Sequence, residues 1–313
     1  MPSFNELVTR TGVASLIPTQ YSTQIIQDAI EESAVLRMAT RLPDMTRGML
    51  NMPVLSSLPM AYFVNGDTGL KQTTKVEWDN KSIVAEEIAV IVPVPDAVLA
   101  DADYDLWTMI QPLVRQAFGQ VVDGAILNST NKPTSWPNGI ITDATTKGNV
   151  ITATADAYKD IMEAEGLISK VEENGFLVNG FLGNVKARSY LRGARGEDGH
   201  PIFRTGMTDG TTYQLDGQRI EFPRNGSMPV SGPLLIAGDW SKLVYAIRQD
   251  MTVTKTNQAV ITDADGKVIL NLYQQDMTAL RFVMRLGWQL PNPANAMGIA
   301  EPYPFAVLNP AGA

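Results

Sequence analysis

The stretch DLWTMIQPLVRQAFGQVVDGAILN, residues 105–128, carries the strongest periodic pattern in the sequence. Its apolar residues recur at steps of three and four, which is the spacing of one face of a helix. This stripe consists of Leu106, Ile110, Leu113, Ala117, Val121 and Ala125. The pattern predicts one long helix that packs the stripe against the rest of the protein. Pro112 must kink this helix or stand in its first turn, because proline has no amide hydrogen to donate.

A long excursion of β-forming residues precedes this helix. Residues 52–55 and 82–92 predict two strands, and the polar stretch 65–75 between them predicts an exposed tip. A hairpin of this length is marginally stable alone, so we expect another surface to support it. Before the excursion, the apolar spacing within residues 20–38 predicts a further helix.

The segments after the long helix mix helical and β-rich patterns. Residues 131–149 predict a loop, residues 156–173 a helix capped by Asp156, and residues 184–191 another helix. Short strands are expected at residues 176–178, 217–222, 233–236, 243–248, 251–256, 268–274 and 277–286. Asp265 and Gly266 predict a hairpin turn, and residues 289–313 show no regular pattern. The fold class is therefore α+β.

The composition excludes much of enzyme chemistry. With 313 residues and 34.1 kDa, the chain can form one large domain or two intertwined ones. It contains one histidine, His200, and no cysteine. A multi-histidine metal site, an iron–sulfur cluster, a cysteine nucleophile and a disulfide framework are thereby excluded. We expect no metal and no cofactor.

The charge balance and the hydropathy limit the partners. Against 25 Lys and Arg there are 33 Asp and Glu, a net charge of −8, which disfavours broad coating of nucleic acid. The longest apolar run, residues 88–100, is interrupted by Pro93, Pro95 and Asp96. We therefore expect no transmembrane helix and no membrane partner.

The common catalytic motifs do not occur in the sequence. Gly193, Gly196 and Gly199 match neither a dinucleotide fingerprint nor a phosphate loop. No serine stands in a G-x-S-x-G elbow, and His200 lies in a Gly-His-Pro loop without a plausible triad partner. A carboxylate-dependent hydrolase stays open as an alternative, because a sequence hides whether two carboxylates lie close in space.

Short motifs spread over most of the chain carry a family resemblance. They are EEIAVIVPVPDAVL at residues 86–99, VVDGAILN at 121–128, DGHPIF at 198–203, GDWSK at 238–242 and QDMTALR at 275–281. In this order, over about residues 17–299, they resemble the major capsid proteins of tailed bacteriophages with the HK97-type fold.

The resemblance implies a domain organisation and a function. Residues 1–50 would form the N-terminal arm, 51–95 the extended E-loop, 96–150 with 280–313 the P-domain around the spine helix, and 151–279 the A-domain. Such a subunit self-assembles through hexamers and pentamers into an icosahedral head that encloses double-stranded DNA. An encapsulin-like nanocompartment shell on the same fold is the alternative.

The resemblance also implies partners and contact residues. The E-loop tip would contact a neighbouring subunit through Asn65, Asp67, Lys71, Lys75 and Trp78. A basic patch on the inner surface would consist of Arg37, Arg41 and Arg47, with DNA enclosed without sequence-specific binding. Further partners would be a portal and separate scaffolding or decoration proteins. The protein would assemble in the cytoplasm of a bacterial host and reside in the virion.

Some members of that family join their subunits by an isopeptide bond between a lysine and an asparagine, assisted by a glutamate. The resemblance makes Lys71 or Lys75 the candidate lysine here. The positions that match the asparagine and the glutamate hold Asp276 and Val283, and neither side chain supplies the required group. We therefore expect no covalent cross-link and no enzymatic activity.

Overall fold

The computed structural model describes residues 33–61, 63–64, 70–71, 73–101, 106–154, 156–193, 214–263, 265–294, 297, 299 and 302–311. All of them belong to one compact unit, Glu31–Ala313. Of the helix predicted at residues 20–38, only the end is described, and it forms α1, Ala34–Met38. Within the described residues, no helix combines the length and the apolar character needed to cross a membrane.

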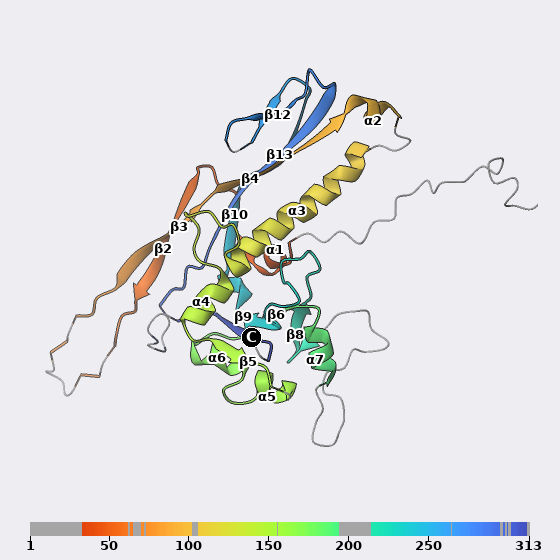
Figure 1. Cartoon of the computed structure of the whole chain (residues 1–313). Helices are drawn as coiled ribbons and strands as arrows, with labels where there is room; N and C mark the ends of the chain where they lie inside the picture. The colour runs from red at the N-terminus through yellow and green to blue at the C-terminus, as the bar shows by residue number, and fades with distance from the viewer. Residues whose placement is uncertain are drawn as a thin grey trace, which may run out of the picture. The chain divides into compact units, whose positions relative to one another are not determined.

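A four-stranded sheet forms one half of this unit (Figure 1). Its strands, in spatial order, are β1 (Thr40–Arg41), β10 (Val244–Thr256), β13 (Met277–Gln289) and β4 (Glu86–Pro95). β13 is antiparallel to both β10 and β4, whereas the short β1 is parallel to β10. The two strands predicted at residues 243–248 and 251–256 are one strand, whose register shifts between Ile247 and Thr252.

The predicted long helix is confirmed as α3, Leu106–Asn128, which follows the short α2, Asp96–Asp101. α3 lies beside this sheet in Figure 1, and its buried Val114 and Phe118 pack with Leu280 and Phe282 of β13. Pro112 stands inside the helix rather than in its first turn.

Part of the predicted stripe of α3 is buried as expected, since Ala125 lies in the large core and Ile110 packs against the cluster around Phe118, but the middle of the stripe faces solvent. Leu113 and Val121 are 44% and 48% exposed, whereas Val114, Phe118 and Val122 are buried. Both rows are apolar, so periodicity predicts the helix but does not select which row meets the sheet. Val114 and Phe118 are buried because they are the residues that pack against β13.

A six-stranded sheet forms the other half. Its spatial order is β5 (Val150–Thr152), β14 (Phe305–Asn309), β9 (Leu235–Gly238), β6 (Gly180–Gly183), β8 (Gln218–Glu221) and β7 (Gln214–Leu215). The helical elements around it are α4 (Ile140–Thr146), α5 (Ala157–Met162), α6 (Leu167–Glu173), α7 (Ala187–Gly193) and the 3₁₀ turn η1 (Trp240–Lys242). β6 and β9 are buried along their whole length, as expected for strands covered on both faces.

Several predicted elements differ from the structure in this half. The helix predicted at residues 156–173 starts after the Asp156 cap, as expected, but breaks into α5 and α6, with Glu165 at a φ of 68° between them. The loop predicted at residues 131–149 contains α4, and the strand predicted at residues 176–178 is replaced by β6. The segment predicted to be irregular contains β14, whose residues pair with both β5 and β9.

Two hairpins complete the fold. β2 (Met49–Ser57) pairs antiparallel with β3 (Glu77–Val84), so the predicted two-stranded excursion is present. The strand predicted at residues 82–92 is wrong in extent, because this range divides between the end of β3 and β4, and β4 pairs with β13 instead. β11 (Val260–Thr262) pairs with β12 (Val268–Asn271), and Gly266 adopts a φ of 80° in the connecting turn. The predicted hairpin is therefore present, and the Asp263 amide donates to the Lys267 carbonyl at 2.9 Å to close its loop.

One large core joins the two halves. Val122, Ile126 and Leu127 of α3 pack in it with Trp288 of β13 and Phe305 of β14. Aromatic side chains make edge-to-face contacts there: the ring centroids are 6.5 Å apart for Trp136 and Trp288 and 5.0 Å apart for Trp240 and Phe305. Three of the five tryptophans are thus core residues, in line with the sequence interpretation.

The assignment of the buried face of α3 is testable with two truncations. Phe118→Ala should lower the free energy of unfolding by about 3–5 kcal/mol, because it leaves a cavity against β13. Leu113→Ala, on the exposed row, should cost less than about 1 kcal/mol. Chemical denaturation of unassembled subunits measures both values, and the reverse order of the two effects would contradict the assignment.

Candidate functional site

The distal part of the β2–β3 hairpin presents large apolar side chains to solvent. Phe63 is fully exposed, Leu70 is 90% exposed and Met60 is 78% exposed. Trp78 on β3, one of the predicted contact residues, is 68% exposed. Single exposed apolar side chains are ordinary, but a group of this size on one segment is typical of an interaction surface.

The other predicted tip residues are polar. Lys71 is exposed, and the ammonium group of Lys75 pairs with the carboxylate of Glu77 at the start of β3. Asn65 and Asp67 lie outside the described residues. The structure thus places Lys71, Lys75 and Trp78 on the same segment as the exposed apolar group.

The base of the hairpin, in contrast, is fixed to the body. The Val84 carbonyl, opposite Met49 at the base, accepts a hydrogen bond from the Trp136 indole at 3.0 Å. Farther along the strands, the Leu55 carbonyl, opposite Trp78, accepts one from the Ala294 amide at 2.8 Å. Ile83 is completely buried in a small core beside the four-stranded sheet. A fixed base and an exposed distal part suit a segment that reaches out to another molecule.

Two of the three predicted basic residues have acidic partners. Arg37 donates to Glu221 at 3.5 Å, and Arg41 donates to Asp44 at 2.8 Å. The hydrogen bond and the charge of Asp44 raise the pKa of Arg41 above its ordinary value. Arg47 is exposed. These partners reduce the positive charge available for phosphate groups.

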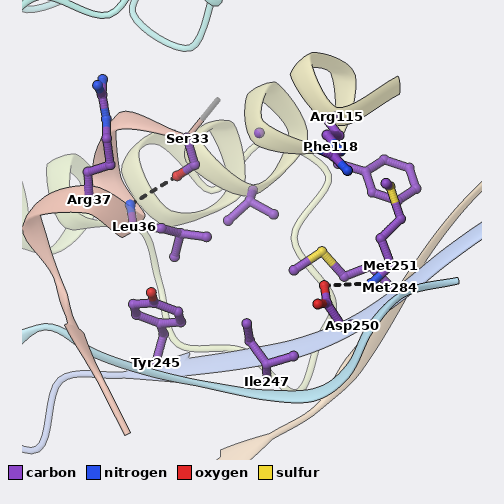
Figure 2. A pocket seen from close by; sticks show the side chains of 12 residues that line it. Ser33, Leu36, Arg37, Arg115, Phe118, Tyr245, Ile247, Asp250, Met251 and Met284 are labelled. Carbon is purple, nitrogen blue, oxygen red and sulfur yellow. Dashed lines mark hydrogen bonds between the residues drawn. The ribbon is translucent and has the colours of Figure 1, made fainter. Parts of the chain in front are cut away.

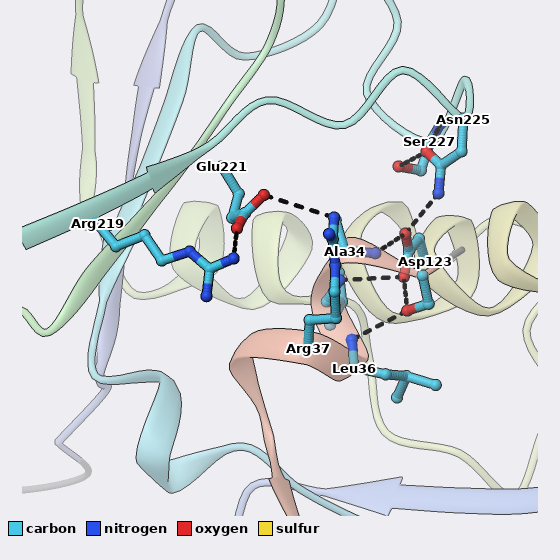
Figure 3. Close-up of polar contacts among 10 residues, drawn as sticks. Ala34, Leu36, Arg37, Asp123, Arg219, Glu221, Asn225 and Ser227 are labelled. Atoms are coloured by element: carbon cyan, nitrogen blue, oxygen red, sulfur yellow. Dashed lines mark hydrogen bonds and ion pairs between the residues drawn. The ribbon is translucent and has the colours of Figure 1, made fainter. Parts of the chain in front are cut away.

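A buried carboxylate on α3 binds two other segments of the chain (Figure 3). The Ser33 hydroxyl donates to Oδ1 of Asp123, and the Val35 amide lies 3.4 Å from the same oxygen. Oδ2 accepts from the Ala34 amide at 3.0 Å and from the Asn225 side-chain amide at 2.8 Å. Asp123 therefore connects the first turn of α1 and the segment between β8 and β9 to the spine helix.

Burial raises the pKa of Asp123 above its ordinary value, and the hydrogen bonds from Ser33, Asn225, Ala34 and Val35 offset only part of this effect. Sequence reasoning did not single out Asp123 as a functional residue. One signal was available in the sequence: Asp123 directly follows Val122, and Val122 belongs to the apolar row of α3 that is buried.

A cavity of about 560 Å³ lies beside this network (Figure 2). Its walls come from α1, α3, β10 and β13 and are mostly apolar. The residues that line it include Ser33, Leu36, Phe118, Tyr245, Ile247, Met251 and Met284. Arg37, Arg115 and Asp250 also line the cavity.

The acidic side chains buried within the described part of the chain are dispersed rather than grouped. No group of three or more His, Asp or Glu side chains among them is placed to hold a metal ion. Their two buried acidic residues belong to separate networks: Asp123 binds α1, whereas Asp160 accepts from the Thr154 hydroxyl at 2.8 Å and from the Tyr190 hydroxyl. Burial and the hydrogen bond to Asp160 raise the pKa of Tyr190 above its ordinary value.

Comparison with known proteins identifies the family. A model described as the phage capsid family matches residues 14–299. The chain belongs to the phage capsid family. This capsid protein is 28% identical over 304 residues to the major capsid protein of Staphylococcus phage 80alpha, and the match covers 93% of this chain and 84% of the relative.

Solved structures support the same conclusion. One from Microbacterium phage Oxtober96 has a TM-score of 0.83 and 35% identity, covering 97% of this chain and 100% of the other. One from Mycobacterium phage Bobi also has a TM-score of 0.83, with 30% identity over 98% of this chain and 100% of the other. The predicted α+β, HK97-like fold is confirmed. The function is structural: the chain is a phage capsid subunit that forms oligomers and resides in the virion.

The raised pKa of Asp123 predicts a pH dependence of stability. A carboxyl whose pKa is higher in the native than in the unfolded state contributes stability below its unfolded pKa of about 3.9, and this contribution is lost as the pH rises through the native pKa. Asp123→Asn cannot titrate. The melting temperature of this variant relative to wild type should therefore rise between about pH 4 and pH 7. A constant difference over this range would contradict the prediction.

Proposed function

We propose that the β2–β3 hairpin is the E-loop of the capsid subunit and binds a neighbouring copy within hexamers and pentamers of an icosahedral head. The observation that carries this proposal is the exposure of Phe63, Leu70 and Trp78 on a segment whose base is fixed. Burial of one such side chain contributes roughly 1.5–3 kcal/mol. Because each subunit of a closed shell makes the same contact, a modest energy per copy stabilises the whole particle.

The strand pairings support domain boundaries that differ slightly from those predicted at 96–150 with 280–313 and at 151–279. β10 pairs with β13 and therefore belongs with the spine helix in the P-domain. β14 pairs with β9 and β5 and therefore belongs in the A-domain. Residues 51–95 remain the E-loop with its return strand, and residues 1–50 the N-terminal arm.

The shell encloses double-stranded DNA without reading its sequence. The net charge of −8 supports confinement of the DNA rather than extensive binding. Arg37, Arg41 and Arg47 form at most a local basic patch on the inner surface, since Glu221 and Asp44 neutralise part of it. Arg219, which also pairs with Glu221, adds one positive charge beside Arg37.

Assembly in the bacterial host cytoplasm further requires a portal and involves separate scaffolding or decoration proteins. The subunit itself performs no catalysis and needs no cofactor. Cross-linking of the shell is also not expected, because Val283 offers no proton-handling group and Asp276 no amide.

The role of the hairpin is testable at its most exposed apolar residue. Phe63→Ser should leave the melting temperature of the unassembled subunit unchanged, because Phe63 makes no buried contact in its own chain. The same variant should reduce particle yield about tenfold or more, since it removes roughly 1.5–3 kcal/mol of burial from each contact. Sedimentation and negative-stain microscopy measure the yield.

Phe63→Leu is the matched control, because it keeps an apolar side chain at the same position. We expect it to assemble nearly as well as wild type. Normal particle yield from Phe63→Ser would refute the contact at this residue, and deletion of residues 65–75 then tests the rest of the tip.

The absence of a covalent shell is testable by denaturing electrophoresis. Purified particles boiled in detergent should give a single band at the subunit mass of 34.1 kDa. Ladders of higher mass that disappear in Lys71→Arg or Lys75→Arg would show an isopeptide bond and contradict the expectation.

A further inference from the structure

An acidic surface covers α5, α6 and the turn between them. Residues 156–173 are all described, and their exposed acidic side chains are Asp156, Glu163, Glu165, Glu172 and Glu173. Only Lys159 and Lys170 are basic in this range, and Lys170 pairs with Glu173 at 2.9 Å. Because the whole chain carries a net charge of −8, an acidic surface alone would be ordinary.

This acidic surface reaches one end of the six-stranded sheet, where β5 is the edge strand. α6 contacts β5 and the neighbouring β14. The side chain of Asn174, directly after α6, donates to the Asn149 side chain, directly before β5, at 3.3 Å. Glu172 and Glu173, in the last turn of α6, therefore lie at the β5 end of the sheet.

A basic surface lies at the other end of the same sheet. In the described residues 184–193 and 214–224, two acidic side chains, Asp216 and Glu221, face a larger basic set: Lys186, Arg188, Arg192, Arg219 and Arg224. Cζ of Arg188 is 5.9 Å from the ring centroid of Phe222, directly after β8, which places α7 beside that strand. β8 and β7 form the end of the sheet opposite β5 (Figure 1).

The exposed side of α7 carries free-standing positive charge in this chain of negative net charge. Ala187 and Leu191 are buried in the core of this half, whereas Lys186 and Arg192 are exposed. The acidic Glu221 nearby is already paired with Arg37 and Arg219, and its side chain is 15% exposed. The charges of this half are thus separated by sign along the sheet rather than mixed.

Opposite charges at opposite ends of one domain favour one kind of contact between copies. In a twofold contact, each end meets its own copy, so like charges face each other and repel. In a head-to-tail contact, the acidic end of one copy meets the basic end of the next, and such contacts close into rings. Complementary charge also excludes wrong orientations during assembly.

We propose that the acidic surface around Glu172 and Glu173 binds the basic surface around Lys186 and Arg192 of the next subunit, and that this contact joins the copies head to tail in each ring. The proposal rests on the proposed shell function, because hexamers and pentamers are such rings, and it adds a second contact to that of the β2–β3 hairpin. A basic surface also attracts DNA phosphates. DNA, however, offers no partner for the acidic surface, whereas a second copy matches both.

The experiment reverses the charge of each surface separately. The acidic-surface variant is Glu172→Lys with Glu173→Lys, and the basic-surface variant is Lys186→Glu with Arg192→Glu. All four side chains are exposed, so the melting temperature of the unassembled subunit should change little. Each variant brings like charges together between copies and should form about tenfold fewer rings and particles. Native mass spectrometry and negative-stain microscopy measure both yields.

Two rescues identify the contact as one between these surfaces. All four changes in one chain bring opposite charges together again, so assembly should return to within about threefold of wild type. Co-expression of the two single-surface variants should yield rings of six, in which they alternate, whereas any ring of five keeps one mismatched contact. About 0.5 M salt should raise the yield of each single-surface variant, because salt screens the repulsion between exposed charges.

Lys159→Glu is the matched control for Arg192→Glu. Both substitutions make the same change in charge at an exposed helical residue, but Lys159 lies within the acidic surface. The control should therefore assemble like wild type, whereas Arg192→Glu should not. If a twofold reversal does not fold, Glu172→Lys, Arg192→Glu and their combination give the same comparison with fewer changes.

Three results would overturn the proposal. Normal ring yield from both single-surface variants would show that neither surface contributes to the contact. A folded four-charge variant that still fails to assemble would show that the two surfaces do not face each other. Normal particles with less DNA from the basic-surface variant would assign that surface to DNA. The shell function fails separately, if wild type itself forms no particles.

Discussion

The carboxyl-terminal half of the spine helix is the region on which both sheets depend. Val122, Ile126 and Leu127 pack in one core with Trp288 from the four-stranded sheet and Phe305 from the six-stranded sheet. Without this helix, each sheet would expose one apolar face to water, at a cost that grows with the apolar area. The helix therefore joins the sheet beside the β2–β3 hairpin to the sheet that contains β8 and β9 in one core.

Asp123 places a polar contact within this apolar region. Neighbouring residues on the same helix contribute only non-directional burial, whereas the carboxylate binds α1 and Asn225 at defined distances. The β2–β3 hairpin differs from this arrangement: its base is hydrogen-bonded to the body, and its distal part exposes Phe63 and Leu70 to solvent.

The local pattern predicts elements well where the apolar period is long and uninterrupted. Residues 105–128 are predicted for this reason, whereas the two hairpins are predicted from short β-rich runs and, in the second, from the Asp265–Gly266 turn. The motif at residues 86–99 forms β4 and the start of α2. The failures are short elements whose stability comes from distant partners. β14 is a strand because it lies between β5 and β9, and its flanking prolines and alanines carry no strand pattern. α5 and α6 are separated at Glu165, whose positive φ interrupts the helix although the apolar spacing of the sequence continues through this region.

Some features of the candidate site were likewise predictable from the sequence, whereas others depend on the tertiary structure. The sequence by itself determined the family, through ordered motifs, and with it the α+β class, the structural function and the exposed hairpin that contains Trp78. Only the tertiary structure decided which apolar row of α3 is buried, that Arg37 and Arg41 have acidic partners, and that Asp123 binds Ser33 and Asn225. These contacts join residues up to 184 positions apart. A periodic pattern indicates which side of a helix or strand is apolar, but it does not indicate which other element packs against that side. That is decided only when the chain folds.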